Sequence, residues 1–140
     1  MIKRIVCPID FSAASCRAAD YALRELAPST GAEVLLVTVL EPSDLRVAMS
    51  AGLHGFDNDE DLHGKVRVWL DEQFARFPAG TKHEVRRGIP EREIVEAIQE
   101  QDADIVVMGA VGIAKRFPLG SKAEYVLRNS GVPLVLVKPE

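Results

Sequence analysis

The fold is decided by the run Ile105-Val106-Val107-Met108-Gly109-Ala110-Val111-Gly112, in which an unbroken apolar segment leads into two glycines. Apolar runs of this kind are typical of a strand buried on both faces of a parallel sheet. Glycines at the end of such a strand let the backbone approach a ligand closely. Gly120 and Ser121 then open a helical run, and amides at a helix N-terminus favour anionic groups such as phosphate. The pattern therefore indicates a ligand-binding turn, with a nucleotide pocket as the first hypothesis.

Outward from this run, strand and helix patterns alternate along the whole chain. Apolar or alternating segments predict strands at 2–8, 34–40, 82–87, 104–108 and 133–137. Helical spacing predicts helices at 13–27, from about 59 to 77, from 90 onward and at 121–129. The order β-α-β-α-β-α-β-α-β implies parallel strands with right-handed crossovers and helices on both faces. The expected class is therefore α/β, in one domain spanning residues 1–140.

Several residues predict where these helices begin and end. Asp10 and Ser12 offer capping oxygens before the first helix, which we expect Pro28 and Gly31 to end. Pro90 occupies a favoured first-turn position, with a buried stripe expected at residues 94, 95, 97 and 98. Ser121 is expected to cap the fourth helix. The spacing of Trp69 indicates a core or interface aromatic.

In a doubly wound sheet, ligands bind beyond the carboxyl ends of the strands, where the strand order reverses. The first and fourth strands both end in unusual turns, at residues 8–10 and 109–112. If these strands are neighbours, the two turns face each other across one crevice. The apolar loop at 41–58 is expected to cover the pocket mouth or a partner surface.

Composition narrows the function classes. The chain has 47% apolar and 27% charged residues and a net charge of −4, which argues against a nucleic-acid partner. It has neither a membrane-length apolar stretch nor a signal-peptide pattern. Cys7 and Cys16 do not form a Cys-x-x-Cys pair, and no basic residue is obviously aimed at either, so both are interpreted as reduced thiols of a cytoplasmic protein. The three histidines, at 54, 63 and 83, lack zinc-ligand spacing.

Together these segments resemble the universal stress protein family over essentially the whole chain. The resemblance is carried by residues 5–12, 34–40, 88–90, 104–109, 120–124 and 130–137, in that order. It implies a Rossmann-like, adenine nucleotide alpha hydrolase-like fold with five parallel strands in the order 3-2-1-4-5. It also implies a cytoplasmic stress-response regulatory protein. Its partner would be a second copy of the chain, paired through the last strand at 133–137.

In nucleotide-binding members of that family, the resemblance implies an ATP or related adenine-nucleotide site between strands one and four. Position by position, Gly109, Gly112, Gly120 and Ser121 would hold the ribose and phosphates, and Lys122 falls in the same site. Asp10, with Pro8 and Ile9, would contact adenine and ribose. Val39 would line the base pocket, and Met108 would lie near the ribose. No metal is expected beyond an Mg²⁺ that accompanies the nucleotide.

The chain departs from the family signature at one place. Seven residues separate Gly112 from Gly120, where the signature has nine. Two fewer residues remove up to about 7 Å of chain reach. Two lost charge-assisted hydrogen bonds would weaken phosphate binding by about 3–6 kcal/mol. Lys115 and Arg116 would compensate electrostatically, or the shorter loop would close over a monophosphate.

Two functions therefore compete. The first is a dimeric regulatory protein that binds an adenine nucleotide. The second is a dimeric interaction module of the same family without nucleotide. Catalysis is not expected, because no nucleophile and base are paired, although slow ATP hydrolysis stays open. A phosphorylation receiver is disfavoured because no acceptor aspartate follows residues 82–88, and an adenylating enzyme because residues 10–14 lack glycine.

Overall fold

The computed structural model describes residues 1–41, 59–110 and 119–139. Its centre is a five-stranded sheet in the order β3-β2-β1-β4-β5, with every pair parallel. The strands are β1 (Arg4–Pro8), β2 (Glu33–Leu40), β3 (Lys82–Arg87), β4 (Ile105–Gly109) and β5 (Leu134–Val137). This confirms both the alternating order and the 3-2-1-4-5 arrangement. The loop at 42–58, expected to cover the pocket mouth, lies outside the described residues.

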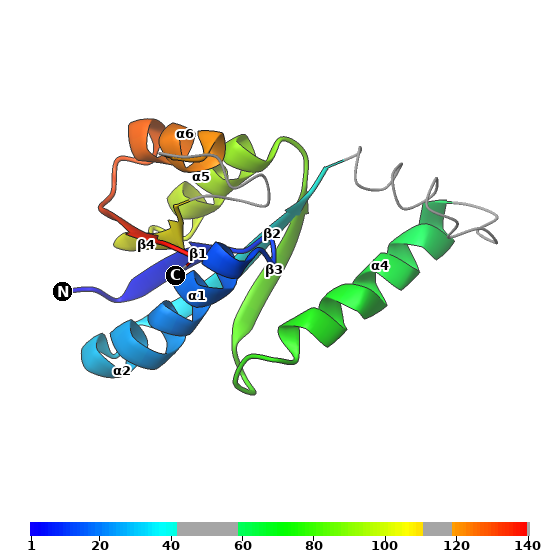
Figure 1. Cartoon of the computed structure of the whole chain (residues 1–140), viewed down its shortest axis with the longest axis horizontal. Helices are drawn as coiled ribbons and strands as arrows, with labels where there is room; N and C mark the ends of the chain where they lie inside the picture. Colours follow the sequence, from blue (N-terminus) through cyan, green and yellow to red (C-terminus); the bar gives the residue numbers. More distant parts are fainter. Residues whose placement is uncertain (42–58, 111–118, 140) are drawn as a thin grey trace.

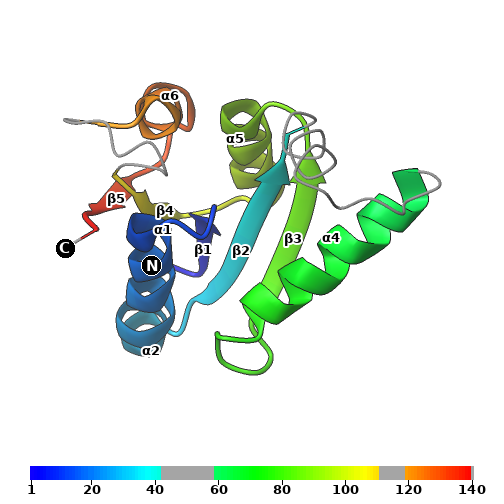
Figure 2. The same ribbon diagram turned by 45° about the vertical axis from the view of Figure 1, so that its right-hand side comes forward.

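The helices cover both faces of the sheet (Figures 1 and 2). They are α1 (Ala13–Tyr21), a π-helical segment η1 (Ala22–Leu26), α2 (Ala27–Thr30), α4 (Asp59–Phe74), α5 (Pro90–Glu100) and α6 (Ser121–Asn129). α1, α2 and α4 lie on one face, and α5 and α6 on the other (Figure 2). In the described part of the chain, no helix is both long and apolar enough to cross a membrane.

Side chains from the central strands alternate between two cores, as the period of a strand requires. Ile5 and Cys7 of β1 point toward α1 and α4, whereas Val6 points toward α5 and α6. The stripe predicted for α5, at residues 94, 95, 97 and 98, is buried. Pro90 is the first residue of this helix, as predicted. The central strands therefore read as unbroken apolar runs because both of their faces are covered.

The first helical region continues past Pro28, which corrects the expectation that Pro28 ends it. A π-helical turn precedes the proline, and the Ala27 amide bonds the Ala22 carbonyl five residues back. A proline ring normally clashes with the carbonyl four residues before it, and we attribute its tolerance here to this wider turn. The helix ends at Thr30, and Gly31 follows in the left-handed conformation (φ 74°), as expected of a terminating glycine.

Two expectations for α4 need revision. The helix ends at Phe74 instead of Phe77, although Phe77 still contributes a buried side chain to the core. Trp69 is 48% exposed, so of its two predicted roles the core role is wrong, and the interface role stays a prediction. Among the residues of α4 whose side chains are described, Leu70 and Phe74 are buried against the sheet.

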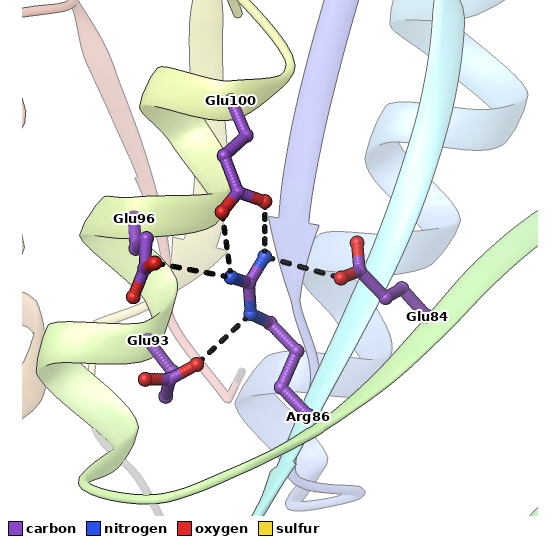
Figure 3. A network of polar contacts seen from close by, with 5 residues as sticks. All are labelled: Glu84, Arg86, Glu93, Glu96 and Glu100. Atoms are coloured by element: carbon purple, nitrogen blue, oxygen red, sulfur yellow. Dashed lines mark hydrogen bonds and ion pairs between the residues drawn. The ribbon is translucent and has the colours of Figure 1, made fainter.

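An arginine clamp joins the edge strand β3 to α5 (Figure 3). The Arg86 side chain is only 11% exposed, and its nitrogens lie 2.9–3.9 Å from carboxylate oxygens of four glutamates. The glutamates are Glu84, Glu93, Glu96 and Glu100. These contacts raise the pKa of Arg86, chiefly through Glu100, and the same hydrogen bond lowers the pKa of Glu100. The clamp therefore fixes α5 against an otherwise exposed strand.

Candidate functional site

The strand order reverses between β1 and β4, so the predicted crevice lies at the carboxyl ends of these two strands. Two turns meet there: the β1–α1 turn and the chain that leaves β4. A series of contacts connects them. The Asp10 amide donates to Ser15 Oγ (3.2 Å), and the Ser15 nitrogen lies 2.9 Å from the position that a Cβ on Gly109 would occupy. The expectation that the first and fourth strands are neighbours is confirmed, and Gly109, where the second turn begins, lies beside the first turn of α1.

Three hydrogen bonds close the β1–α1 turn into a ring. The Ser12 amide donates to Asp10 Oδ1 (2.9 Å), the Ser15 amide to Ser12 Oγ (3.3 Å), and the Asp10 amide to Ser15 Oγ (3.2 Å). Of the two residues predicted to cap α1, Ser12 is the N-cap. The Asp10 carboxylate instead accepts a hydrogen bond within the turn that precedes the helix. One Asp10 oxygen is used within the turn, so its other carboxylate oxygen is the one to consider for ligand contact.

Gly109 is the last residue of β4, and its lack of a side chain lets α1 pack directly on the strand. A Cβ there would lie 2.9 Å from both Ala14 Cβ and the Ser15 nitrogen. Neighbours this close belong largely to helix backbone, which does not move aside cheaply. The glycine therefore has a packing reason that is independent of any ligand.

Beyond the following segment, the chain returns to the same place. The Gly120 amide donates to the Ala110 carbonyl (2.9 Å), and the Ala110 amide donates to the Val137 carbonyl (2.9 Å). Gly120, not Ser121, is the N-cap of α6, which corrects that expectation, and no described side chain caps this helix. The first amides of α6 thus begin beside the carboxyl end of β4. Gly112, Lys115 and Arg116 lie outside the described residues.

The predicted base-pocket residues separate onto two faces of the sheet. Val39 and Met108 pack in the core beneath α5 and α6, whereas Ile9 is buried in the core beneath α1 and α4. The Ile9 backbone is also occupied, because its amide bonds the Val37 carbonyl and its carbonyl accepts the Thr38 hydroxyl. Pro8 is buried at the end of β1, and Lys122 is half-buried in the first turn of α6.

The structure places a basic residue next to one cysteine, which local sequence could not show. Cys7 and Cys16 are both free thiols, and burial raises the pKa of Cys7. Arg76 Nη1 donates to Cys16 Sγ (3.3 Å) from the turn after α4, 60 residues away. The earlier view that no basic group faces either thiol is therefore wrong for Cys16. Among the described residues, no group of three metal-ligating side chains occurs.

A separate hollow of about 450 Å³ lies at the amino end of the sheet, lined by Met1, Lys3, Arg4, Asp102 and Asp104. The Asp104 carboxylate accepts the Lys3 and Arg4 amides (2.7 and 3.0 Å), which lowers its pKa. Its polar groups thus hold the start of β1 against the start of β4. This hollow lies at the amino ends of the strands, whereas the predicted crevice lies at their carboxyl ends.

Comparison with known proteins agrees with this architecture. The universal stress protein family model matches residues 1–138. The chain is 31% identical to a universal stress protein of Methanocaldococcus jannaschii, with 99% of this chain and 83% of that protein covered. It is similar in fold to the universal stress protein UspA from Lactobacillus plantarum (24% identity, 97% of each chain, TM-score 0.69). It is also similar to a universal stress protein solved in complex with cAMP (26% identity, 99% of this chain and 98% of that chain, TM-score 0.64). The chain therefore belongs to the universal stress protein family.

Proposed function

We propose that this protein is a cytoplasmic stress-response regulator that binds an adenine nucleotide, ATP or a smaller relative, between β1 and β4. The observation that carries the proposal is the meeting of the Asp10 turn, Gly109 and the start of α6 at the strand-order reversal. Unpaired amides at a helix N-terminus attract anionic groups, and an Asp carboxylate accepts ribose hydroxyls. The similar protein solved with cAMP supports this class of ligand.

One feature favours a short phosphate chain over a triphosphate. The Gly120 amide, which would otherwise face the phosphates, is already bonded to the Ala110 carbonyl. With seven residues between Gly112 and Gly120, fewer backbone donors remain for distal phosphates. If so many donors are lost that no phosphate binds, the protein is instead an interaction module without nucleotide, which is the second candidate function.

The proposal concerns binding and regulation, not catalysis. One Asp10 oxygen is held by the Ser12 amide, and a phosphoryl-transfer site also needs a positioned water and usually a metal carboxylate. An Mg²⁺ would arrive only with the nucleotide. As partner we propose a second copy of the chain, paired through β5, because this strand is an edge of the sheet.

The direct test combines two measurements. Mass spectrometry of gently denatured protein shows whether a nucleotide co-purifies, and calorimetry with ATP, AMP and cAMP measures affinity. Gly120 has φ −65° and ψ 148°, which valine adopts readily, so Gly120→Val should cost about 1 kcal/mol or less of stability through its weaker cap. It should nevertheless abolish binding, because its branched Cβ intrudes on the phosphates.

The matched control is Gly64→Val in α4, where a Cβ would meet nothing within 4 Å. This variant should bind as the wild type does. Equal affinity in Gly120→Val would exclude the start of α6 as the phosphate site. Failure of the wild type to carry or bind any of the three nucleotides would favour the interaction module.

A further inference from the structure

Phe11 connects the β1–α1 turn to α4 through a row of aromatic side chains. Its ring centroid lies 5.6 Å from that of Trp69 and 5.4 Å from that of Phe74, both edge to face. Phe74 stacks in turn on the His83 imidazole, with centroids 4.1 Å apart. The row therefore joins the turn that carries Asp10 to α4 and to the edge strand β3.

The backbone of Phe11 is in an unfavourable conformation. Its φ is 62°, in the left-handed region that bulky side chains rarely adopt. Such conformations persist only where surrounding contacts over-determine them, often at ligand sites. Here the contacts are the hydrogen-bond ring of Asp10, Ser12 and Ser15 on one side and the two α4 aromatics on the other.

We propose that Phe11 is a positioning residue for Asp10, and that α4 holds Phe11 in place through Trp69 and Phe74. Loss of the aromatic contacts would free Phe11 to leave the left-handed region, and the neighbouring Asp10 carboxylate would move with it. Packing of α4 and occupancy of the crevice are then coupled, and by linkage each strengthens the other. The ligand part of this inference rests on the proposed function, whereas the link between α4 and the turn does not.

The variant Trp69→Ala tests the link from a half-exposed position on α4 that belongs to no predicted ligand contact. With cAMP as the probe, its affinity should fall at least about fivefold, the lower end of typical coupling between sites. Trp69→Phe keeps a ring against Phe11 and should restore most of the affinity. Val68→Ala, at an exposed neighbour outside the row, should bind as the wild type does.

Hydrogen exchange of the Asp10 and Ser12 amides tests the link without any ligand. Both amides bond side chains within the turn, so they should exchange at least about fivefold faster in Trp69→Ala than in Val68→Ala. Equal exchange in these two variants would overturn the inference. Faster exchange in a protein that binds no nucleotide would leave the link intact and reject only the proposed function.

A double-mutant cycle identifies Phe11 as the route. Phe11→Gly adopts the left-handed conformation without strain and has no ring for α4 to hold. In that background, Trp69→Ala should change the exchange of the Asp10 amide no further. A second full increase would mean that α4 acts on the turn by another path, and the role of Phe11 would be rejected.

Discussion

Gly109 fits a ligand-binding sequence pattern, but the packing of α1 against β4 also requires a glycine at this position. The position matches the first glycine of a nucleotide-binding signature. In the structure, it is also where α1 packs against β4, with helix atoms 2.9 Å from the site of a Cβ. The same contact holds Ser15, whose hydroxyl accepts the Asp10 amide. Both the packing of α1 on β4 and the geometry of the Asp10 turn therefore depend on Gly109.

We expect Gly109→Ala to lower the free energy of unfolding by about 1–3 kcal/mol, as overpacked core positions do. The added methyl would push the first turn of α1 away and strain the bond between the Ser15 amide and Ser12 Oγ. Urea denaturation measures the change. Gly64→Ala, at an open helical position, should instead raise stability by up to about 1 kcal/mol. Equal stabilities for Gly109→Ala and the wild type would show that α1 yields without cost.

Sequence correctly predicted the helix ends that are set by the conformational preference of the residue itself. It failed at helix ends that are set by the backbone conformation of a neighbouring residue. Pro90 at the start of α5 and Gly31 after α2 were predictable, because proline fixes φ and glycine accepts positive φ. The choice between Asp10 and Ser12 as a cap was not, because it depends on the left-handed φ of Phe11 between them. Ser121 lost the cap position to Gly120 because Gly120 is tied to Ala110.

At the scale of elements, the strands and the buried stripe of α5 were predictable because the spacing of apolar residues can be read from a single sequence. The Arg86 clamp was not, because its four carboxylates come from two elements that meet only in the fold (Figure 3). The aromatic row and the contact between Arg76 and Cys16 were hidden for the same reason. The π-helical turn that accommodates Pro28 has no recognised signal in sequence.

We predict that the clamp makes stability depend on pH. Arg86 lowers the pKa of Glu100, so the stabilisation is complete above the ordinary glutamate range and is lost as pH falls through the lowered value. Arg86→Met should destabilise by about 1–3 kcal/mol near neutral pH, since it leaves the carboxylates facing one another. The difference from wild type should shrink between about pH 7 and pH 3, as protonation removes the repulsion.

Urea denaturation at each pH measures this difference, and Lys82 supplies the control. Lys82 lies on the same strand, and its pair with Glu33 (3.4 Å) is well exposed on both sides, so Lys82→Met should change stability little at any pH. An Arg86→Met deficit that stayed constant across the pH range would assign the role of Arg86 to packing alone.

At the scale of the whole molecule, the order of the sheet leaves β5 as an edge. The Pro133 and Val137 carbonyls bond toward β4, so by strand alternation the backbone of Leu134 and Leu136 faces outward. The Leu136 side chain is also 37% exposed. An open apolar edge favours pairing with another strand, and a two-fold axis would let β5 meet its own copy.

We therefore expect a homodimer that Leu136→Pro converts to a monomer. Proline removes an outward-facing amide without breaking a bond to β4, so the monomer should remain folded. Sedimentation at micromolar concentration measures the mass, and circular dichroism checks the fold. Val68→Ser, at an exposed apolar position on α4, away from β5, should stay dimeric. A wild-type monomer at this concentration would refute pairing through β5.

The two hydrogen bonds of the Ala110 backbone have a consequence for engineering. Its carbonyl receives Gly120 and its amide reaches Val137, so the intervening stretch leaves from and returns to one fixed point. A connection whose ends are pinned together tolerates insertion, deletion or replacement at low entropic cost. We therefore expect the stretch between Ala110 and Gly120 to accept replacement without loss of the fold. If the proposed function holds, stretches of different length grafted between Ala110 and Gly120 should change which ligand binds while the fold is kept.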